Sequence, residues 1–543
     1  MEQTRLDGAL YKQLICAGAA NLQRHEEEIN DLNVFPIPDG DTGSNMLMTI
    51  MGGVHEVESQ DLGEVAKEVA NGMLLSARGN SGVILSQFFD GIAVGFSGVE
   101  SAETEDMFTA FDKGVKSAYE AVEVPTEGTI LTVMKEATEY ACKKKADTPM
   151  QFIQNFLAEA RRSLERTPEL LKVLKEAGVV DSGGAGLVYI IEGMEKALLG
   201  ESLDLAKTTQ EVGAEPDYNL FTADDELTFG YCTEVLLRLQ HKKTNIDEFS
   251  AQAFSSALST LGDSIVCVQN DTIVKIHVHT KTPSAVLEFC QRYGEFLKVK
   301  IENMSLQHNG VVEKKGEEKK APQKDYGVVA VAMGEGIKEA FFGAGADIVI
   351  DGGQTCNPAT EDFLTAFEQV NAKTIFVFPN NSNVILTAKQ ASKLYEKANV
   401  IVMESKDIGQ GYAGLSMLDT TLSTTEEMVE MMSAQMQITK TAEVSQAIKD
   451  STMSAFTIQT GDYMGFSGKE ILAVEKDKLS AVYQTLNGMK IGEYAVCIIF
   501  VGEDGTQEEQ GKIESYMQKH YPETELYFIE GKQKVYSYIL IGE

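Results

Sequence analysis

Two aspartates flank a glycine near the start of this 543-residue chain, in the stretch that runs from Asn33 to Met46. Mg²⁺ prefers oxygen ligands, and in phosphoryl transfer one or two carboxylates typically hold it together with the phosphates of a nucleotide. Asp39 and Asp41 therefore predict a site for two adjacent ions, with Asn33 as a third oxygen donor. The competing interpretation is an ordinary Asp-Gly turn in which Asn or Thr caps a helix.

Three further turns rich in small residues follow the aspartates. They are Ser76–Gly82, which contains Arg78, Gly79, Asn80 and Ser81, then Gly128–Thr132, and then Asp181–Gly186. Free backbone N–H groups at a helix N-terminus suit phosphate oxygens, and Arg78 adds a charge that can stabilise a transition state. Each turn alone is explained equally well as a connection between helices. Together with the aspartates they predict several glycine-rich rims in one domain.

The elements that position these residues follow from apolar spacing. From Leu6 to about Gly200, apolar residues recur at helical intervals, as at Ala66, Val69 and Met73, and β-branched alternation is scarce. We therefore expect an all-α domain over residues 1–205, followed by a polar, acidic linker over Thr208–Glu226.

A small α+β domain is expected over residues 226–312. Ser264–Val268 and Thr272–Thr280 predict two strands joined by a tight turn at Asn270-Asp271. Helices are expected over Thr233–Gln240 and Ala285–Arg292.

Two histidines in this middle region share one face of a predicted strand. Alternate side chains of a strand point the same way, so His277 and His279 lie opposite the apolar Val274, Ile276 and Val278. Both imidazoles can then reach one Zn²⁺, with Cys232 as a third ligand, which predicts a zinc site. We favour a structural site over a catalytic one, although three visible protein ligands also fit a catalytic site. The alternative is two solvent-facing histidines on a half-exposed strand.

The remainder of the chain comprises a second linker and a third domain. Glu313–Lys324 is charged and has no large apolar residue, which indicates a flexible linker. Residues 325–543 alternate apolar strands with helices and predict an α/β domain with a largely parallel sheet. The expected strands are Val328–Ala332, Asp347–Ile350, Thr374–Phe378, Val400–Met403, Ala495–Phe500 and Glu525–Ile529, and expected helices include Glu361–Gln369 and Ala388–Glu396.

Composition narrows the class of protein. The chain has 82 acidic and 47 basic residues, a net charge of −35, which argues against binding to nucleic acid or to an anionic membrane surface. Seven scattered cysteines do not form a disulfide framework, and no apolar run reaches the length of a membrane span. We expect a cytoplasmic protein.

The motifs resemble a known family. Asp39–Met46 and the turns at Gly79–Gly82 and Asp181–Gly186 are similar to the nucleotide-binding component (DhaL) of dihydroxyacetone kinases. The longer Asn33–Gly43 motif is similar to that of the FakA/YloV group, the ATP-binding catalytic component of bacterial fatty acid kinases. That resemblance continues through Lys275–Thr280 and into the third domain at Asp351–Thr355, Asn357-Pro358 and Pro379–Asn383.

The resemblance implies a barrel of antiparallel helices with ATP and two Mg²⁺ at one end. Asp39 and Asp41 carry over as metal ligands, whereas the third aspartate of the dihydroxyacetone kinase pattern is matched here only by Asn33 at an altered spacing. A histidine of that pattern is replaced by Thr42. The positions that fall where the family binds nucleotide are Thr42, Gly43, Ser44, Asn45, Met46, Gly79, Asn80, Ser81, Gly82, Thr129 and Asp181.

The implied activity is phosphorylation of a fatty acid's carboxylate, for phospholipid synthesis, while a separate FakB/DegV-like carrier protein presents the acid. We expect the third domain to dock the carrier and the middle domain to form a homodimer. Two alternatives remain at this point: a kinase for a small hydroxy-ketone such as dihydroxyacetone, and a regulatory or scaffold protein with a silent nucleotide site.

Overall fold

The computed structural model describes residues 4–543 with several gaps. The gaps are residues 33–39, 55–58, 202, 204, 206–230, scattered positions between 241 and 271, 304–322, 354–355, 422–423 and 454–455. The first predicted linker and most of the second therefore lie outside the described residues. Two compact units form: residues 1–207 together with 322–543, and residues 208–321.

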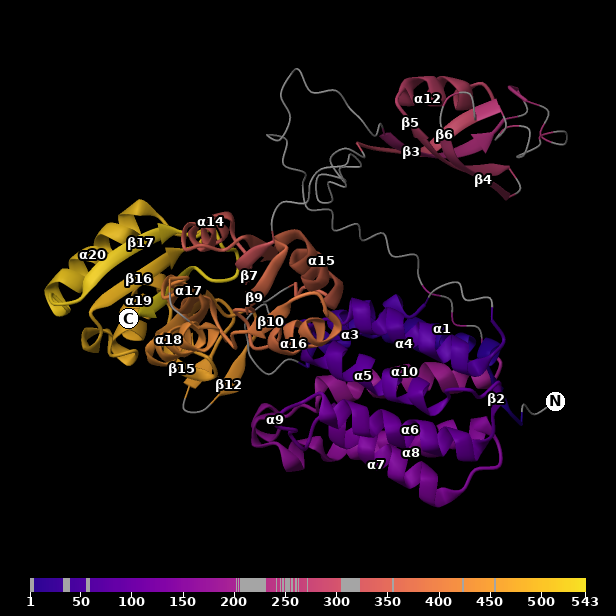
Figure 1. The fold of residues 1–543 in the computed structure, drawn as a ribbon, viewed down its shortest axis with the longest axis horizontal. Helices are drawn as coiled ribbons and strands as arrows, with labels where there is room; N and C mark the ends of the chain where they lie inside the picture. Colours follow the sequence, from indigo (N-terminus) through magenta and orange to yellow (C-terminus); the bar gives the residue numbers. More distant parts are fainter. Residues whose placement is uncertain are drawn as a thin grey trace. The chain divides into compact units, whose positions relative to one another are not determined.

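The N-terminal domain is helical, as predicted (Figure 1). Its helices are α1 (Gly8–Arg24), α2 (Glu26–Asp31), α3 (Thr42–Gly52), α4 (Leu62–Ser76), α5 (Gly79–Gly95), α6 (Thr104–Glu120), α7 (Ile130–Lys144), α8 (Pro149–Leu170), α9 (Lys172–Ala177) and α10 (Ser182–Leu198). Two short strands, β1 (Leu6–Asp7) and β2 (Ser101–Ala102), pair antiparallel beside them.

The helices of this domain pack around one apolar core. Phe111 belongs to this core, and its ring lies edge-on to Phe88 at 5.7 Å and to Phe152 at 4.8 Å between centroids. Helices α1 and α10 approach closely because Gly193 faces the backbone of α1: a Cβ there would lie 2.3 Å from the carbonyl oxygen of Ala17. Among the described residues, no helix is long and apolar enough to cross a membrane.

The C-terminal domain combines two sheets. The first is wholly parallel in the order β10-β9-β7-β8, built from β7 (Lys324–Ala332), β8 (Ile348–Asp351), β9 (Ala372–Phe378) and β10 (Asn399–Val402). The second has the order β15-β14-β11-β18-β16-β17, from β11 (Lys440–Gln446), β14 (Tyr463–Ser467), β15 (Glu470–Glu475), β16 (Val496–Val501), β17 (Glu525–Glu530) and β18 (Tyr538–Gly542). β12 (Ser451–Met453) and β13 (Phe456–Ile458) form a separate hairpin.

The prediction of a largely parallel sheet is thus right for the first sheet and wrong for the second. In the second sheet β16 and β17 run parallel, and the other neighbouring strands run antiparallel. The helices of this domain are α14 (Glu335–Gly343), α15 (Thr360–Val370), α16 (Ile385–Leu394), α17 (Ile408–Ser416), α18 (Thr425–Ile438), α19 (Lys478–Gly488) and α20 (Gln507–His520), with a short 3₁₀ turn at Ile491–Glu493.

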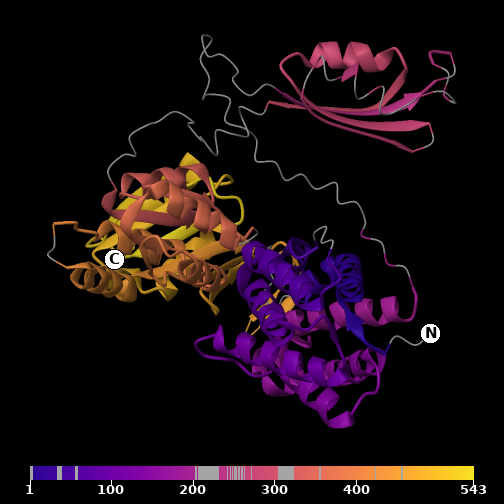
Figure 2. The ribbon, with the colours of Figure 1, turned by 45° about the vertical axis from the view of Figure 1, so that its right-hand side comes forward.

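The middle unit is a four-stranded antiparallel sheet with helix α12 (Pro283–Gln291) over one face (Figure 2). Its strand order is β4-β5-β3-β6, from β3 (Tyr231–Leu239), β4 (Asp263–Asn270), β5 (Ile273–Thr280) and β6 (Gly294–Asn303). The predicted hairpin and the second predicted helix are confirmed. The helix predicted over Thr233–Gln240 is wrong, because Val235, Leu237 and Leu239 are buried at alternate positions, which is the period of a strand.

Candidate active site

Asp41 stands immediately before α3 and does not act as its helix cap. Its backbone carbonyl accepts the N–H of Asn45 at 2.8 Å, but its carboxylate makes no capping hydrogen bond to the helix. Oδ2 instead accepts a hydrogen bond of 2.6 Å from the Asn357 amide. The Asp41 carboxylate is therefore not engaged in capping α3.

A residue that the sequence analysis missed caps α3. Asn30, at the end of α2, accepts the N–H of Gly43 through Oδ1 at 2.7 Å, and its amide donates to Ser44 Oγ at 3.1 Å. Ser44 Oγ donates in turn to Glu26 at 2.6 Å. Gly43 has no room for a side chain, since a Cβ would lie 2.4 Å from the Glu26 carbonyl. Helix α2 therefore fixes the start of α3.

Four helix N-termini meet at this end of the domain. Ser182, in the first turn of α10, donates through Oγ to Thr42 Oγ1 in the first turn of α3 at 3.2 Å. Asp181 accepts the N–H of Gly184 at 2.7 Å and also the N–H of Ile130, which joins α10 to α7. Helix N-termini carry partial positive charge and attract anions.

The fourth N-terminus is that of α5, which begins beside α3. The Arg78 N–H donates to Thr49 Oγ1 at 3.3 Å, and Gly79 adopts φ +58°, which favours glycine. Gly82 packs against α3 so closely that a Cβ would lie 2.4 Å from Thr49 Oγ1. The predicted Gly79–Gly82 turn is thus a tight α3–α5 junction that brings the start of α5 to the same place.

The other residues predicted to bind nucleotide differ in how far they are buried. Met46 is fully buried and packs against Gly186 of α10, and Asn45 is 6 % exposed. Ser81 is half-buried in the first turn of α5. Thr129 is half-buried before α7 and donates to the carbonyl of Thr126 at 2.8 Å. Asn33 and Asp39 lie outside the described residues.

Burial changes the ionisation of one group in this cluster. Desolvation raises the pKa of Asp181 to about 6, although the two backbone hydrogen bonds that its carboxylate accepts favour the charged form. The carboxylate therefore gains its proton near the acid edge of the physiological range. A change of charge at the start of α10 would be felt by any anion bound there.

The residues around Asp41 fit a hard cation such as Mg²⁺. A half-buried carboxylate that does not cap its helix is one ligand of suitable type. At the start of α5, the amide oxygen of Asn80 is buried and has no hydrogen-bond partner among the described residues, while its amide nitrogen donates to Asn383 Oδ1 at 3.2 Å. A buried acceptor without a partner costs about 1–3 kcal/mol, which a bound ion or its water would remove.

The strand register of the middle unit gives the backbone positions of the predicted zinc ligands. Cys232 pairs directly with His279 across β3 and β5, and Glu234 pairs with His277. Val274, Ile276 and Val278 are buried on the other face of β5, as predicted. Cys232 lies within strand β3 and not before a helix. Among the side chains that the structure describes, no group of three His, Cys, Asp or Glu is arranged to hold a metal ion.

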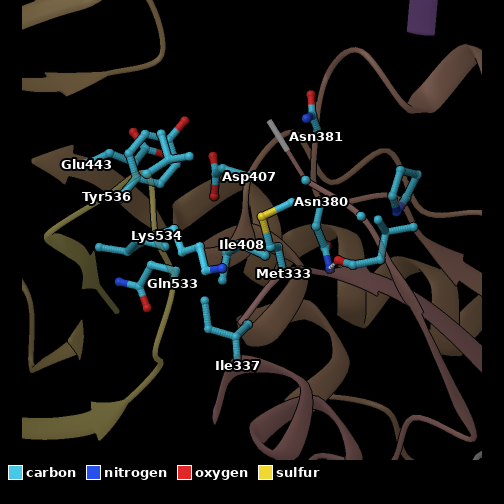
Figure 3. A pocket seen from close by; sticks show the side chains of 16 residues that line it. Met333, Ile337, Asn380, Asn381, Asp407, Ile408, Glu443, Gln533, Lys534 and Tyr536 are labelled. Atoms are coloured by element: carbon cyan, nitrogen blue, oxygen red, sulfur yellow. Dashed lines mark hydrogen bonds between the residues drawn. The ribbon is translucent and has the colours of Figure 1, made fainter. Parts of the chain in front are cut away.

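The C-terminal domain holds a small apolar cavity of about 50 Å³ between its sheets (Figure 3). Glu443 of β11 and Asp407, the N-cap of α17, both line it. Burial, and then the charge of Asp407, raise the pKa of Glu443 to about 8, so Glu443 is protonated at neutral pH. Sequence reasoning missed this pair, because the two residues lie on separate elements and share no motif.

Comparison with known proteins finds matches along nearly the whole chain. A DAK2 domain model matches residues 36–196, and models described as the middle and C-terminal domains of FakA-like fatty acid kinase proteins match residues 228–311 and 327–543. Protein YloV of Bacillus subtilis is 38 % identical over 558 residues, covering 99 % of each chain. The chain belongs to the FakA-like fatty acid kinase family. The resemblance inferred from the motifs is confirmed, and the matched domains are of kinase type, as predicted.

A further relative and two solved structures also match parts or all of the chain. An uncharacterized protein of Staphylococcus haemolyticus is 37 % identical over 99 % of this chain and 100 % of its own length. The dihydroxyacetone kinase of C. freundii, solved with AMP-PNP and Mg²⁺, covers 35 % of this chain and 34 % of its own at 20 % identity and a TM-score of 0.28. Fatty Acid Kinase (Fak) B3 of Streptococcus pneumoniae, loaded with linoleic acid, covers 34 % and 75 % at 18 % identity and 0.26. TM-scores this low add nothing to the assignment.

Proposed function

We propose that this protein is an ATP-dependent kinase that phosphorylates the carboxylate of a fatty acid presented by a separate fatty-acid-binding protein. The observation that carries the proposal is the meeting of the N-termini of α3, α5, α7 and α10 beside the Asp41 carboxylate, which does not cap its own helix. Partial positive charge beside a carboxylate is what a magnesium-bound nucleotide phosphate needs. The choice of a fatty acid as the substrate is inferred from membership in the FakA-like fatty acid kinase family.

The chain's own residues then have distinct tasks. Phosphate oxygens are bound by first-turn N–H groups of α5 and α10 other than that of Gly184, which Asp181 caps, while the Gly43 N–H of α3 is already bonded to Asn30. Asp41, with Asp39 as predicted from the motif, holds Mg²⁺, which would neutralise charge on the phosphates during transfer. The Arg78 guanidinium has five N–H donors, one of which donates to the Asn357 carbonyl at 2.8 Å. In this proposal, other N–H groups of Arg78 donate to a phosphate of the nucleotide.

The transfer requires no general base, because a fatty acid is already a carboxylate at neutral pH. One carboxylate oxygen attacks the γ-phosphorus, the bond from that phosphorus to the β–γ bridging oxygen breaks, and ADP leaves with the electron pair. The product is an acyl phosphate. Catalysis then rests on positioning and on electrostatic stabilisation by the site.

A carrier is part of the proposal because a free fatty acid is a poor substrate in water. We assign docking of the carrier to the C-terminal domain and dimer formation to the middle domain. Deletion of residues 325–543 is expected to abolish carrier binding, and sedimentation of the full chain is expected to give twice the mass of 59.3 kDa.

The test is acyl-phosphate formation. The full chain is mixed with MgATP, oleate and a purified DegV-like carrier, and hydroxylamine traps the product as a hydroxamate. We expect a carrier-dependent hydroxamate that Asp41→Ala abolishes while the fold is kept. Asp90→Ala is a matched control, because Asp90 is also half-buried but lies in the C-terminal half of α5, about three turns from its N-terminus.

Three outcomes would contradict the proposal in different ways. Normal activity of Asp41→Ala would refute the assigned site. Phosphorylation of dihydroxyacetone in place of oleate would favour a hydroxy-ketone kinase. Absence of any Mg²⁺-dependent nucleotide binding would favour a scaffold protein.

Zinc in the middle unit is a separate proposal, supported by the backbone register of Cys232 and His279 and by the position of His277 on the same strand face. Metal analysis of protein purified without chelator should give close to one zinc per chain. His277→Ala and Cys232→Ala should each lose it, and equal zinc in the variants would refute the ligand set.

A further inference from the structure

A residue of the C-terminal domain reaches the predicted metal ligand of the N-terminal domain. Asn357 lies 316 positions after Asp41, yet its Nδ2 donates to Asp41 Oδ2 at 2.6 Å. The Asn357 backbone carbonyl accepts from the Arg78 guanidinium at 2.8 Å. One residue thus contacts two of the side chains with predicted catalytic roles, Asp41 and Arg78, within one compact unit of the fold.

The contact is fixed by the residues that follow Asn357. Ala359 forms an isolated antiparallel bridge with Arg78, and the Thr360 N–H donates to the Ala77 carbonyl at 3.2 Å. A Cβ on Gly79 would lie 3.1 Å from Asn357 Nδ2, so the start of α5 leaves room for the amide. The side chain is 1 % exposed. The backbone on both sides of the contact therefore holds the amide in place.

The other end of this amide is unsatisfied. Asn357 Oδ1 is buried and has no hydrogen-bond partner among the described residues. Reversing the amide would not help, because Oδ1 would then face the Asp41 carboxylate and two acceptors would repel. The orphaned atom is therefore an oxygen acceptor beside a carboxylate. Such a place suits a cation or its bound water and disfavours an anion.

We propose that the C-terminal domain supplies Asn357 to the magnesium site of the kinase. The amide nitrogen orients Asp41, and the amide oxygen either coordinates the Mg²⁺ ion or accepts a hydrogen bond from its bound water. This inference rests on the proposed function of the same site. Its consequence is that Mg²⁺ loading depends on the C-terminal domain, independently of any part that domain plays in docking a carrier.

The experiment measures metal affinity and not turnover. Binding of AMP-PNP to the full chain is titrated with Mg²⁺, and Mn²⁺ binding is followed by electron paramagnetic resonance. Asn357→Ala should raise the Mg²⁺ concentration for half-maximal nucleotide binding by about tenfold or more, since groups that orient the ligands of a metal typically contribute 10- to 100-fold in affinity.

Two further variants separate a metal role from simple packing. Asn357→Asp keeps an oxygen for the ion but loses the N–H that orients Asp41, so it should lose less Mg²⁺ affinity than Asn357→Ala. Lys389→Ala breaks another contact between the same domains, the 3.2 Å pair of Lys389 with Glu123, and should leave Mg²⁺ affinity unchanged. Equal loss in the Ala and Asp variants of Asn357, or no loss in either, would overturn the inference.

The outcomes also separate this inference from the proposed function. If the wild type binds Mg²⁺ and AMP-PNP and Asn357→Ala binds them equally well, only the role of Asn357 fails. If the wild type binds neither, the kinase assignment fails with it.

Discussion

The Asp181 carboxylate gives a prediction whose size follows from the structure. Its pKa in the folded protein is about 6, against a usual 3.8, because burial opposes the charged form. The folded state therefore holds the proton more tightly than the unfolded state. The stabilisation that this proton provides is complete below pH 3.8 and is lost as the pH rises through 6, and at full size it amounts to ~3 kcal/mol.

Asp181→Asn isolates this effect. Asparagine caps a helix about as well as aspartate, so the N–H of Gly184 keeps its acceptor, but the side chain cannot ionise. The variant should therefore gain stability relative to the wild type as the pH rises. Linkage predicts a gain of up to ~1.4 kcal/mol between pH 5 and pH 8, which is about tenfold in an opening equilibrium. Because Asp181 is only half-buried, about twofold is the lower limit.

Hydrogen exchange of the α10 amides measures this gain locally. Wild type and variant are compared at the same pH, so the chemical exchange rate cancels for the unchanged segment 184–198. The ratio of wild-type to variant exchange should rise between two- and tenfold from pH 5 to pH 8, while peptides of α20 show a constant ratio. An α10 ratio that stays constant, or that falls with pH, would refute the reasoning.

Two other predictions concern stability. Glu443→Gln should gain stability relative to the wild type as the pH rises through 8, because the folded wild type gives up there the proton that its raised pKa had made stabilising. Hydrogen exchange of the β11 amides at pH 6 and pH 9 checks this, and a difference between the two proteins that does not change with pH would contradict it. Gly193→Ala should lower the thermal midpoint of the helical domain, because its Cβ would meet the Ala17 carbonyl at 2.3 Å. In the matched Gly511→Ala of α20 the new Cβ meets nothing within 4 Å, so helix propensity should stabilise it by ~1 kcal/mol, and equal effects would refute the packing argument.

The helical domain and the parallel sheet were predictable because each has a strong local signal. Long segments with helical apolar spacing leave one interpretation, and continuous apolar runs such as Val328–Ala332 mark strands buried on both faces. Short half-buried strands carry a weaker signal. Thr233–Gln240 fits either period over eight residues. β11 is buried over most of its length, but the charged Glu443 at its centre interrupts the apolar pattern. An apolar run does not specify the direction of a strand, so the antiparallel pairings of the second sheet were missed.

The site was predictable only where it is local in sequence. The Asp41 motif and the Gly79 turn stand out as spacings of small and acidic residues. Asn30 could not be identified as the cap of α3 because it lies on another helix and carries no motif. Asn357 was noted only as part of a family pattern, since a contact across 316 positions depends on how two domains meet.

The central claim is that phosphoryl passes from ATP to the oxygen of a fatty acid's carboxylate. The most direct measurement uses oleate labelled with ¹⁸O in both carboxylate oxygens, bound to the carrier, with unlabelled MgATP. After hydroxylamine cleaves the product at its carbonyl, the released inorganic phosphate is examined by mass spectrometry. The account predicts one ¹⁸O in that phosphate. Unlabelled phosphate would mean that ATP was hydrolysed by water, and ¹⁸O in AMP would mean an acyl adenylate; either result would contradict the account.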